Sequence, residues 1–309
     1  MRCVLIYNPE AGRGRKQRAE QLRQAADALN GLGHVVEVMT TNAPGCATMQ
    51  AKEAVRQGAE IVFACGGDGT VHEVLQGLVS DSGEHTAALG IIPMGSANAL
   101  ARHLRLPRNP VKAVLRQIDV VPRTIPVGKA YFDGRVRYFT VMAGAGPDGA
   151  LVYDLLTAHK SSLGRMAYYL RAARLFATRR FHPFEVHYDE LRSGARVARR
   201  AVSVMAVRVG SLGGLFSRLA GRGGGIEDNQ LRLMILGPPA WLSLPLWFLC
   251  GWLGMRGFNP FFRVVEVAGF SCFALSGPAA HFEADGEWLG HIPIEVSLIP
   301  NALRILIPE

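Results

Sequence analysis

Apolar and polar residues alternate in two different patterns along this chain, and the pattern changes near residue 123. In the first part, apolar runs such as CVLIY (3–7) alternate with longer stretches in which apolar residues recur every three or four positions. The stretch 16–30, for example, places Ala19, Leu22, Ala26 and Leu29 on one helical face. Strands that alternate with helices predict a parallel sheet covered on both faces, which is a doubly wound α/β domain.

The expected elements of this first part follow from the same periodicities. Strands are predicted at 3–7, 35–40, 60–65 and 88–93, and helices at 16–30, 47–57, 70–78, 97–104 and 111–118. From about 123 onward, short β-like runs such as FEVHYD (184–189) and LRLMIL (231–236) dominate. This pattern of many short β-like runs predicts an antiparallel β-sandwich with a few helices. The linker around Pro122 and Pro126 separates a domain at 1–123 from a β-rich domain at 124–299.

One stretch, 233–255, contains no charged residue and is long enough to cross a bilayer. However, Pro238-Pro239 and Pro245 interrupt it, so that the continuous segment is 240–255. We expect a helix that is buried in the core, or one that lies in a membrane interface or lines a lipid pocket, rather than a true span.

Charge and cysteine content narrow the class of protein. The formal net charge is +9, so the surface should attract anions such as nucleotide phosphates or anionic lipid headgroups. No nucleic-acid-binding module is recognisable, and nucleic acid is not an expected partner. The five cysteines are odd in number and widely spaced, which favours buried thiols in a reducing compartment. Because the first strand-like run begins at residue 2, no signal peptide is expected and a cytoplasmic location is predicted.

The stretch GGDGT (66–70) follows an apolar strand and opens a helix. Glycines let backbone amides approach a phosphate closely, and the positive end of a helix favours an anion. Asp68 would repel phosphate unless Mg²⁺ lies between the two charges or the carboxylate accepts a proton. The alternative is a tight turn in which Asp68 only caps a helix.

Two further loops follow apolar strands. In PMGSANALARHL (93–104), Gly95, Ser96 and Asn98 precede a helix that could hold another part of a nucleotide, or that is simply N-capped. In NPEAGRGRKQ (8–17), Asn8 and Gly12 follow the first strand, but the spacing is not that of a Walker A loop.

Four motifs in this order resemble the catalytic domain of the diacylglycerol kinase family, which includes bacterial lipid kinases and sphingosine and ceramide kinases. They are YNPEAGRGR (7–15), GGDGTVHEVLQGL (66–78), IIPMGSANALARHL (91–104) and EADGEWLG (283–290). The resemblance covers nearly the whole chain and implies ATP-dependent phosphorylation of a lipid hydroxyl, with Mg²⁺, in an interdomain cleft. It also implies that the last strand, about 300–309, returns to the first domain.

The resemblance assigns roles residue by residue. It implies an ATP site formed by Asn8, Gly12, Gly66, Gly67, Asp68, Gly69, Thr70, Gly95, Ser96 and Asn98, with Glu73 supporting the loop. Glu287 and Asp285 would face the cleft from the second domain. We predict Glu287 as the base and Asp68 as the residue that organises Mg²⁺ and phosphate, with the reverse assignment as the second choice. Because Asp-Gly favours tight turns, ADGEW could instead be only a hairpin turn.

The chain departs from the family pattern at two places. Ala99 stands where many bacterial members carry Asp, and SANALA looks more like the sphingoid-type kinases. The segment IEDNQLRLMIL (226–236) keeps Asp228 but lacks the neighbouring glycine and later Asp that can hold a structural Mg²⁺, so no second metal is predicted. Asp148 matches an acidic position that can face substrate, or it is a turn carboxylate.

A lipid substrate requires contact with a membrane. The stretch 161–181 combines apolar residues at helical spacing with several arginines, which is typical of helices that bind anionic membrane surfaces, although a helix that covers a sheet has the same pattern. Arg165 in this stretch could instead reach the nucleotide phosphates. The expected partners are a lipid substrate and an anionic membrane surface, contacted peripherally, and the chain is compatible with a homodimer. The competing functions are a kinase of a soluble substrate, such as NAD, and a non-catalytic nucleotide- or lipid-binding regulator.

Overall fold

A computed structural model of the chain describes residues 1–12, 15–80, 86–157, 174–175, 178–210, 225–255, 258–275 and 277–308. The chain divides into two compact units. Unit 1 comprises Met1–Val127 and Ile299–Glu309, and unit 2 comprises Gly128–Leu298. The boundaries predicted from the sequence lay at 123 and at about 300.

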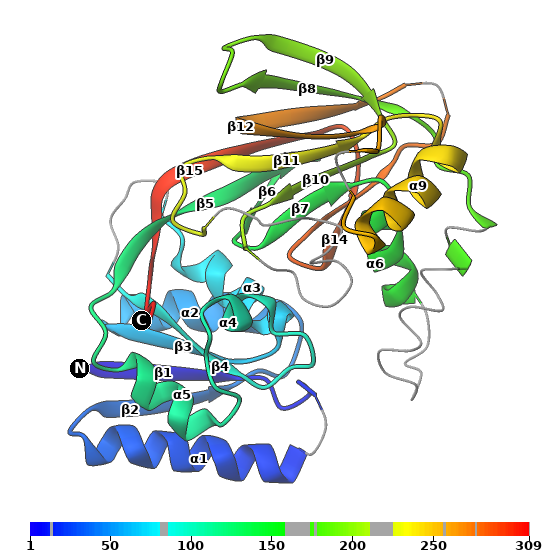
Figure 1. Ribbon diagram of the computed structural model, residues 1–309. Helices are drawn as coiled ribbons and strands as arrows, with labels where there is room; N and C mark the ends of the chain where they lie inside the picture. Colours follow the sequence, from blue (N-terminus) through cyan, green and yellow to red (C-terminus); the bar gives the residue numbers. More distant parts are fainter. Residues whose placement is uncertain are drawn as a thin grey trace. The chain divides into compact units, whose positions relative to one another are not determined.

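Unit 1 is a parallel sheet with helices on both faces (Figure 1). Along the chain it contains β1 (Arg2–Tyr7), α1 (Arg15–Gly31), β2 (Val35–Thr40), α2 (Cys46–Arg56), β3 (Ile61–Gly66), α3 (Asp68–Leu78), β4 (Ala88–Pro93), α4 (Ala99–His103) and α5 (Pro110–Gln117). The strand order is β2-β1-β3-β4, all parallel. The end of β15 (Ile294–Ile305) extends this sheet, because Ile305 pairs in parallel with Leu89 of β4.

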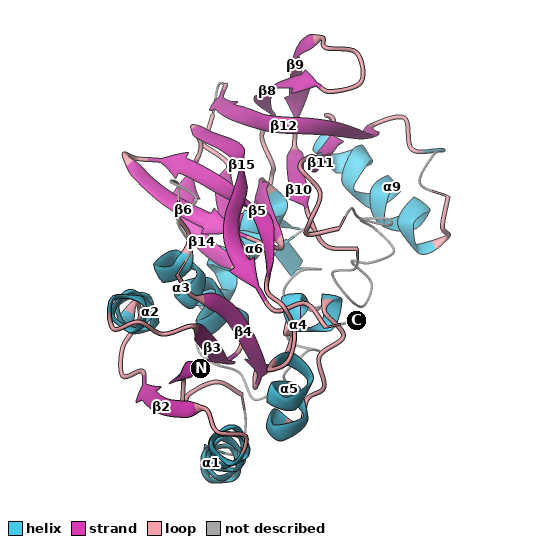
Figure 2. Ribbon diagram, turned by 90° about the vertical axis from the view of Figure 1, so that its left-hand side faces the viewer, coloured by secondary structure: helices cyan, strands magenta, loops and turns pink. Residues whose placement is uncertain are grey.

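The strands of unit 1 are apolar throughout because both of their faces are buried. Cys3 and Leu5 of β1 share a core with Leu22 of α1 and Val114 of α5, whereas Val4 of β1 is buried on the opposite side of the strand. Figure 2 shows α1 and α5 on one face of the sheet and α2 and α3 on the other. The doubly wound arrangement predicted from the sequence is therefore confirmed.

Unit 2 is built mainly from antiparallel strands. Its elements are β5 (Arg123–Phe132), which begins in unit 1, β6 (Arg135–Phe139), β7 (Met142–Ala145), α6 (Pro147–Thr157), β8 (Phe184–Glu190), β9 (Arg196–Ala201), β10 (Ser203–Val207), β11 (Leu231–Leu236), α9 (Ala240–Trp252), β12 (Phe262–Ala274), β13 (His281–Ala284), β14 (Glu287–His291) and the first part of β15. The strand order is β14-β13-β7-β10-β11-β12-β15, with β8-β9 attached to β12 and β5-β6 attached to β15.

The strands of unit 2 enclose a large apolar core. Phe132 of β5 and Phe282 of β13 belong to strands that are far apart in the strand order, yet their ring centroids lie 6.4 Å apart. Both rings are part of one cluster that takes side chains from nearly every strand of the unit. The sheet therefore curves back on itself around the core, and the predicted fold class, an α/β domain followed by an antiparallel β domain, is confirmed.

The uncharged stretch 233–255 forms β11 and, after Pro238-Pro239, the short helix α9. Among the helices that the structure describes, none combines the length and the apolarity needed to cross a bilayer. One face of α9 is buried and the other is exposed, so the expectation of a core helix holds for one face only, and the alternative of a helix in a membrane interface or lining a lipid pocket stays a prediction. The five cysteines are unpaired, and all of them except the half-buried Cys46 are buried, as predicted.

Candidate nucleotide site and acidic groups

A cavity of about 780 Å³ lies at the carboxyl ends of the parallel strands of unit 1. In the strand order β2-β1-β3-β4, the direction of the connections reverses between β1 and β3. At such a switch point the loops after the two strands diverge to opposite faces and leave a crevice that binds ligands in open α/β sheets. The cavity is lined by residues 8–12 after β1, 40–44 after β2, Gly67, Gly69 and Thr70 after β3, Gly95 and Ser96 after β4, and Ala47 and Glu73.

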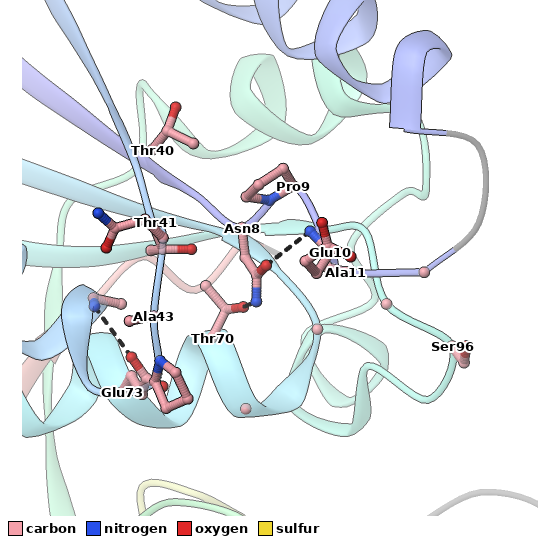
Figure 3. Close-up of a pocket in the computed structure, with 17 residues that line it drawn as sticks. Asn8, Pro9, Glu10, Ala11, Thr40, Thr41, Ala43, Thr70, Glu73 and Ser96 are labelled. Atoms are coloured by element: carbon pink, nitrogen blue, oxygen red, sulfur yellow. Dashed lines mark hydrogen bonds between the residues drawn. The ribbon is translucent and has the colours of Figure 1, made fainter. Parts of the chain in front are cut away.

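The loops after β1, β3 and β4 are joined by direct contacts. Asn8 Nδ2 donates a hydrogen bond of 3.2 Å to Thr70 Oγ1, and the backbone amide of Glu10 donates to Asn8 Oδ1 at 2.9 Å (Figure 3). Gly95 has no room for a side chain, because a Cβ would lie 2.5 Å from the Cα of Gly67. The glycines of two different motifs therefore allow two backbone segments to touch at the wall of the cavity.

Asp68 holds the loop after β4 rather than lining the cavity. Its Oδ2 accepts from the backbone amide of Asn98 at 2.7 Å, and its Oδ1 accepts from that of Ala99 at 2.6 Å. These amides are at the start of α4, where backbone donors have no partner within the helix. Asn98 itself is buried, and its side chain exchanges two hydrogen bonds with the backbone of Gly95. Asp68 therefore caps a helix, as the alternative from the sequence proposed, but the helix that it caps is α4 and not α3, to which it belongs.

Glu73 supports a different part of the wall from the one expected. Its Oε2 accepts from the backbone amide of Ala47 at 3.1 Å (Figure 3). Its backbone carbonyl accepts from the Thr48 hydroxyl at 2.8 Å. The glutamate therefore satisfies a donor at the start of α2, whose capping residue Gly45 has no side chain to do so. Sequence reasoning had placed this support within the GGDGT loop.

Two features beside the cavity favour an anion. The start of α3 lines it and presents the positive end of that helix, whereas the start of α2 is already occupied by the carboxylate of Glu73. Arg18 of α1 donates to the carbonyl oxygens of Ala11 and Met94, which places a guanidinium between the loops after β1 and β4. Sequence reasoning did not single out Arg18, since a basic residue in an amphipathic helix carries no specific signal.

The DGE motif forms the hairpin between β13 and β14 in unit 2. Asp285 and Gly286 both have positive φ, 50° and 84°, as a tight two-residue turn requires. The Asp285 carboxylate accepts backbone hydrogen bonds of 2.8 to 3.0 Å from Thr140, Val141 and Met142. Asp285 therefore has the hairpin-turn role that the sequence also allowed, and its carboxylate holds the turn against the segment between β6 and β7. Glu287 is half-buried and begins β14 directly after this fixed turn.

Asp148 lies in the first turn of α6 and belongs to a buried acidic pair with Glu283. Within the described part of the chain, neither carboxylate oxygen of Asp148 has a hydrogen-bond partner of normal geometry, and Glu283 Oε1 also lacks such a partner. Burial raises the pKa of Asp148 to about 7, with partial compensation from the amides of Gly149 and Asp148. Burial, and then the charge of Asp148, raise the pKa of Glu283 well above its ordinary value.

Arg208, which follows β10, is a second feature that the sequence did not reveal. Its side chain is almost completely buried and donates to the carbonyl of Ile226 at 2.7 Å. Burial lowers the pKa of Arg208 to about 10, while the charges of Asp285 and Asp228 act in the opposite direction. The guanidinium therefore offsets the negative charge of the DGE turn from within unit 2.

The residues predicted for the nucleotide site fall into three groups in the structure. Eight of the residues predicted for a nucleotide line the cavity: Asn8, Gly12, Gly67, Gly69, Thr70, Glu73, Gly95 and Ser96. Gly66, Asp68 and Asn98 lie behind that wall. Arg165 and most of the basic stretch 161–181 lie outside the described residues. The loop after β2, residues 40–44, contributes to the cavity without any motif that would have identified it.

Comparisons with known proteins bear on the family. The family model described as the diacylglycerol kinase catalytic domain matches residues 2–130. A diacylglycerol kinase of Bacillus subtilis is 34% identical over 238 residues, which cover 76% of this chain and 73% of the relative. A diacylglycerol kinase of Staphylococcus haemolyticus is 31% identical over 185 residues, or 60% of this chain and 54% of the relative. A crystal structure of a diacylglycerol kinase from Bacillus anthracis matches with a TM-score of 0.72 at 22% identity, covering 99% and 96% of the two chains. The last match concerns the fold alone.

Proposed function

The chain belongs to the diacylglycerol kinase family and is a lipid kinase, and we propose that it transfers the γ-phosphoryl group of ATP to the hydroxyl of a diacylglycerol or sphingoid lipid. The observation that carries this proposal is the cavity of about 780 Å³ in unit 1, which is lined by three of the four motifs. Its volume is within the ordinary range for small-molecule sites. A competing role as a non-catalytic regulator would not require the acidic hairpin of unit 2.

The residues around the cavity suit a nucleotide. Asn8 and Thr70 hold each other at its wall, and the first turn of α3 offers backbone amides to phosphate oxygens. When bound there, ATP supplies the phosphoryl group and ADP as leaving group. The protein contributes position, exclusion of water and donors aimed at the phosphates, which are the main sources of catalysis in phosphoryl transfer.

Mg²⁺ is part of the proposal, but the described residues do not form a metal cage. They contain no group of three or more His, Cys, Asp or Glu side chains placed to share a metal ion. Both oxygens of Asp68, the predicted ligand, accept backbone hydrogen bonds. Mg²⁺ is commonly held by substrate phosphates with one or two carboxylates, so we propose that it arrives with the nucleotide and assign no step to a protein-bound metal.

Glu287 is the proposed general base. It would accept the proton of the lipid hydroxyl while that oxygen forms a bond to the γ-phosphorus and the bond to the β-phosphate oxygen breaks. Asp285 is a positioning residue, because its carboxylate is engaged by the backbone of residues 140–142. Phosphoryl transfer requires Glu287 and the γ-phosphate to meet, which we propose happens during turnover.

The acceptor class is tested by a labelled-ATP assay with diacylglycerol, monoacylglycerol, phosphatidylglycerol, sphingosine and ceramide, and with NAD as the soluble control. We expect Mg²⁺-dependent phosphorylation of at least one lipid and none of NAD, because the DGE and SANALA motifs are those of lipid kinases. A sphingoid product in preference to a glycerolipid product would agree with Ala99. Phosphorylated NAD without a lipid product, or nucleotide binding without turnover, would contradict the proposal.

A further inference from the structure

The helix α9 of unit 2 exposes large apolar side chains to solvent. Trp241 and Trp252 are 77% and 62% exposed, and Phe258, just beyond the helix, is 75% exposed. Trp241, Pro245, Leu249 and Trp252 recur at intervals of three and four and therefore share one face. No charged residue lies between 240 and 255. A contiguous apolar face of this kind is typical of a surface that binds another molecule or a membrane.

The opposite face of α9 fixes the helix to unit 2. Leu244, Trp247 and Cys250 are buried, and the Trp247 ring lies 6.3 Å from that of Phe262 at the start of β12. Both views of the molecule show α9 on the outside of the sheet, near β10 and β11 (Figures 1 and 2). The exposed tryptophans are thus held in place by packing on the other side of the same short helix.

Three arginines gather where this apolar segment leaves and rejoins the sheet. A cavity of about 210 Å³ is lined by Arg199, Arg200 and Arg263, together with Pro238 on one side of the α9 segment and Phe261 on the other. Arg199 and Arg200 come from the edge strand β9, and Arg263 comes from β12. A small cavity lined by three arginine residues suits a phosphate group, which arginine binds through paired donors.

Among the described residues, these arginines have no acidic partner. None of the three makes an ion pair or a side-chain hydrogen bond with another described residue, and the stretches of unit 2 that are not described contain no Asp or Glu. Glu185, which pairs with Arg200 across the strands, is bound by His187 instead. The positive charge of the cavity is therefore uncompensated by the residues of unit 2 that could reach it.

We infer that the exposed face of α9 and the cavity of Arg199, Arg200 and Arg263 together form a docking surface for an anionic phospholipid membrane. The apolar face enters the interfacial layer, where tryptophan side chains are favoured, and the arginines bind the phosphates of anionic lipids beside it. Charge selects this occupant. A second copy of the chain would bring three more unpaired arginines and a net charge of +9 to the contact.

The inference extends the proposed function, since a lipid kinase must reach an acceptor that resides in a membrane, but it can be tested without turnover. The full-length protein is sedimented with phosphatidylcholine vesicles that either contain or lack phosphatidylglycerol, in the absence of ATP. The Trp241→Ala/Trp252→Ala variant should bind both kinds of vesicle about tenfold more weakly. Arg199→Gln and Arg263→Gln should each weaken binding to the phosphatidylglycerol vesicles about fivefold and leave binding to pure phosphatidylcholine unchanged.

Arg196→Gln is the matched control, because Arg196 is on the same strand β9 but does not line the cavity. Circular dichroism and thermal melting should show that all variants fold, since every substituted side chain is exposed. The inference is overturned if the wild type does not bind vesicles, if the tryptophan variant binds as the wild type does, or if Arg196→Gln has the same effect as Arg199→Gln. It is also overturned if the wild type is a dimer that the tryptophan substitutions dissociate. Because the vesicle assay involves no phosphate transfer, its results can be interpreted even if the proposed catalysis is wrong.

Discussion

The carboxyl group of Asp148 lies in surroundings that disfavour its ionised form. It is buried against Gly144, whose Cα leaves space for it, and no described residue gives either oxygen a hydrogen bond of normal geometry. When it is ionised, its charge raises the pKa of two other buried groups, the carboxyl of Glu283 and the thiol of Cys272, although burial is the larger cause for both. The raised pKa of Asp148, about 7, follows mainly from this burial.

The stability of unit 2 should therefore fall as the pH rises. The folded pKa of Asp148 lies above the ordinary value of 3.8, so the folded state holds a proton that the unfolded state releases between 3.8 and about 7. The resulting stabilisation is complete below the lower value and is lost as the pH approaches the higher one, with a slope of up to about 1.4 kcal/mol per pH unit for one proton. Urea denaturation across this range measures the free energy of unfolding.

Asp148→Asn should flatten this dependence, and the remaining slope would belong to Glu283. Asp189→Asn is the control, because Asp189 is an exposed carboxyl of β8. If wild-type stability rises with pH over this range, or if both variants retain the full slope, Asp148 is not a buried acid of the kind described.

These residue-scale features show what the sequence could not reveal. Asp148 was singled out by its resemblance to a family position, but Glu283 was not, because a glutamate between Phe282 and Ala284 in a β-strand has no local signature of burial. Arg208 and the three arginines near α9 were counted only as net charge. Whether a charged side chain is paired, buried or open to a ligand depends on strands that are distant in the sequence.

At the scale of elements, Asp68 couples two of them. It belongs to α3, and both of its oxygens bind amides at the start of α4, about 30 residues later in the chain. The sequence pattern correctly located the two glycine-rich loops at strand ends, since strand periodicity and glycine content are local properties. It could not predict that the carboxylate of the first loop would hold the second, because that contact depends on how β3 and β4 pair.

Asp68→Ala should reduce stability as well as activity. It leaves two backbone donors at the start of α4 without their acceptors, at a cost of about 1–3 kcal/mol in the free energy of unfolding. Asp68→Asn keeps one acceptor oxygen and should lose about half as much. Urea denaturation checks both variants, with Asp27→Ala on the exposed surface of α1 as the control that should change stability by less than about 0.5 kcal/mol. An Asp68→Ala protein of wild-type stability would show that the carboxylate acts only on a ligand.

The helix and strand boundaries were largely predictable. The predicted helix at 16–30 is Arg15–Gly31, and the predicted strand at 35–40 is Val35–Thr40. Parallel strands between two helical layers must be apolar on both faces, which makes them conspicuous in the sequence. The exception is α9, where an apolar sequence did not reveal that one face remains exposed, because apolarity alone does not distinguish burial in protein from contact with lipid.

In the whole molecule, the two units have different proposed tasks. Unit 1 would hold the nucleotide in its cavity, and unit 2, which also carries the buried acidic pair, would supply Glu287 and the proposed membrane-docking surface. Membership of the diacylglycerol kinase family agrees with both tasks, but the choice of lipid depends on side chains that the family motifs do not specify. The net charge of +9 would favour the approach of the whole molecule to an anionic bilayer.

The central claim, that Glu287 acts on an acceptor while unit 1 holds ATP, is tested most directly by one comparison of Glu287→Gln with the wild type. ATP affinity and the rate of phosphate transfer to a micellar lipid are measured on the same preparations. Loss of a general base predicts unchanged ATP affinity and a fall in kcat of about 10²–10⁴-fold, whereas Glu295→Gln, a substitution of an exposed carboxylate of β15, should leave both unchanged. A Glu287→Gln enzyme that retains wild-type kcat, or one that loses ATP binding, would contradict the account.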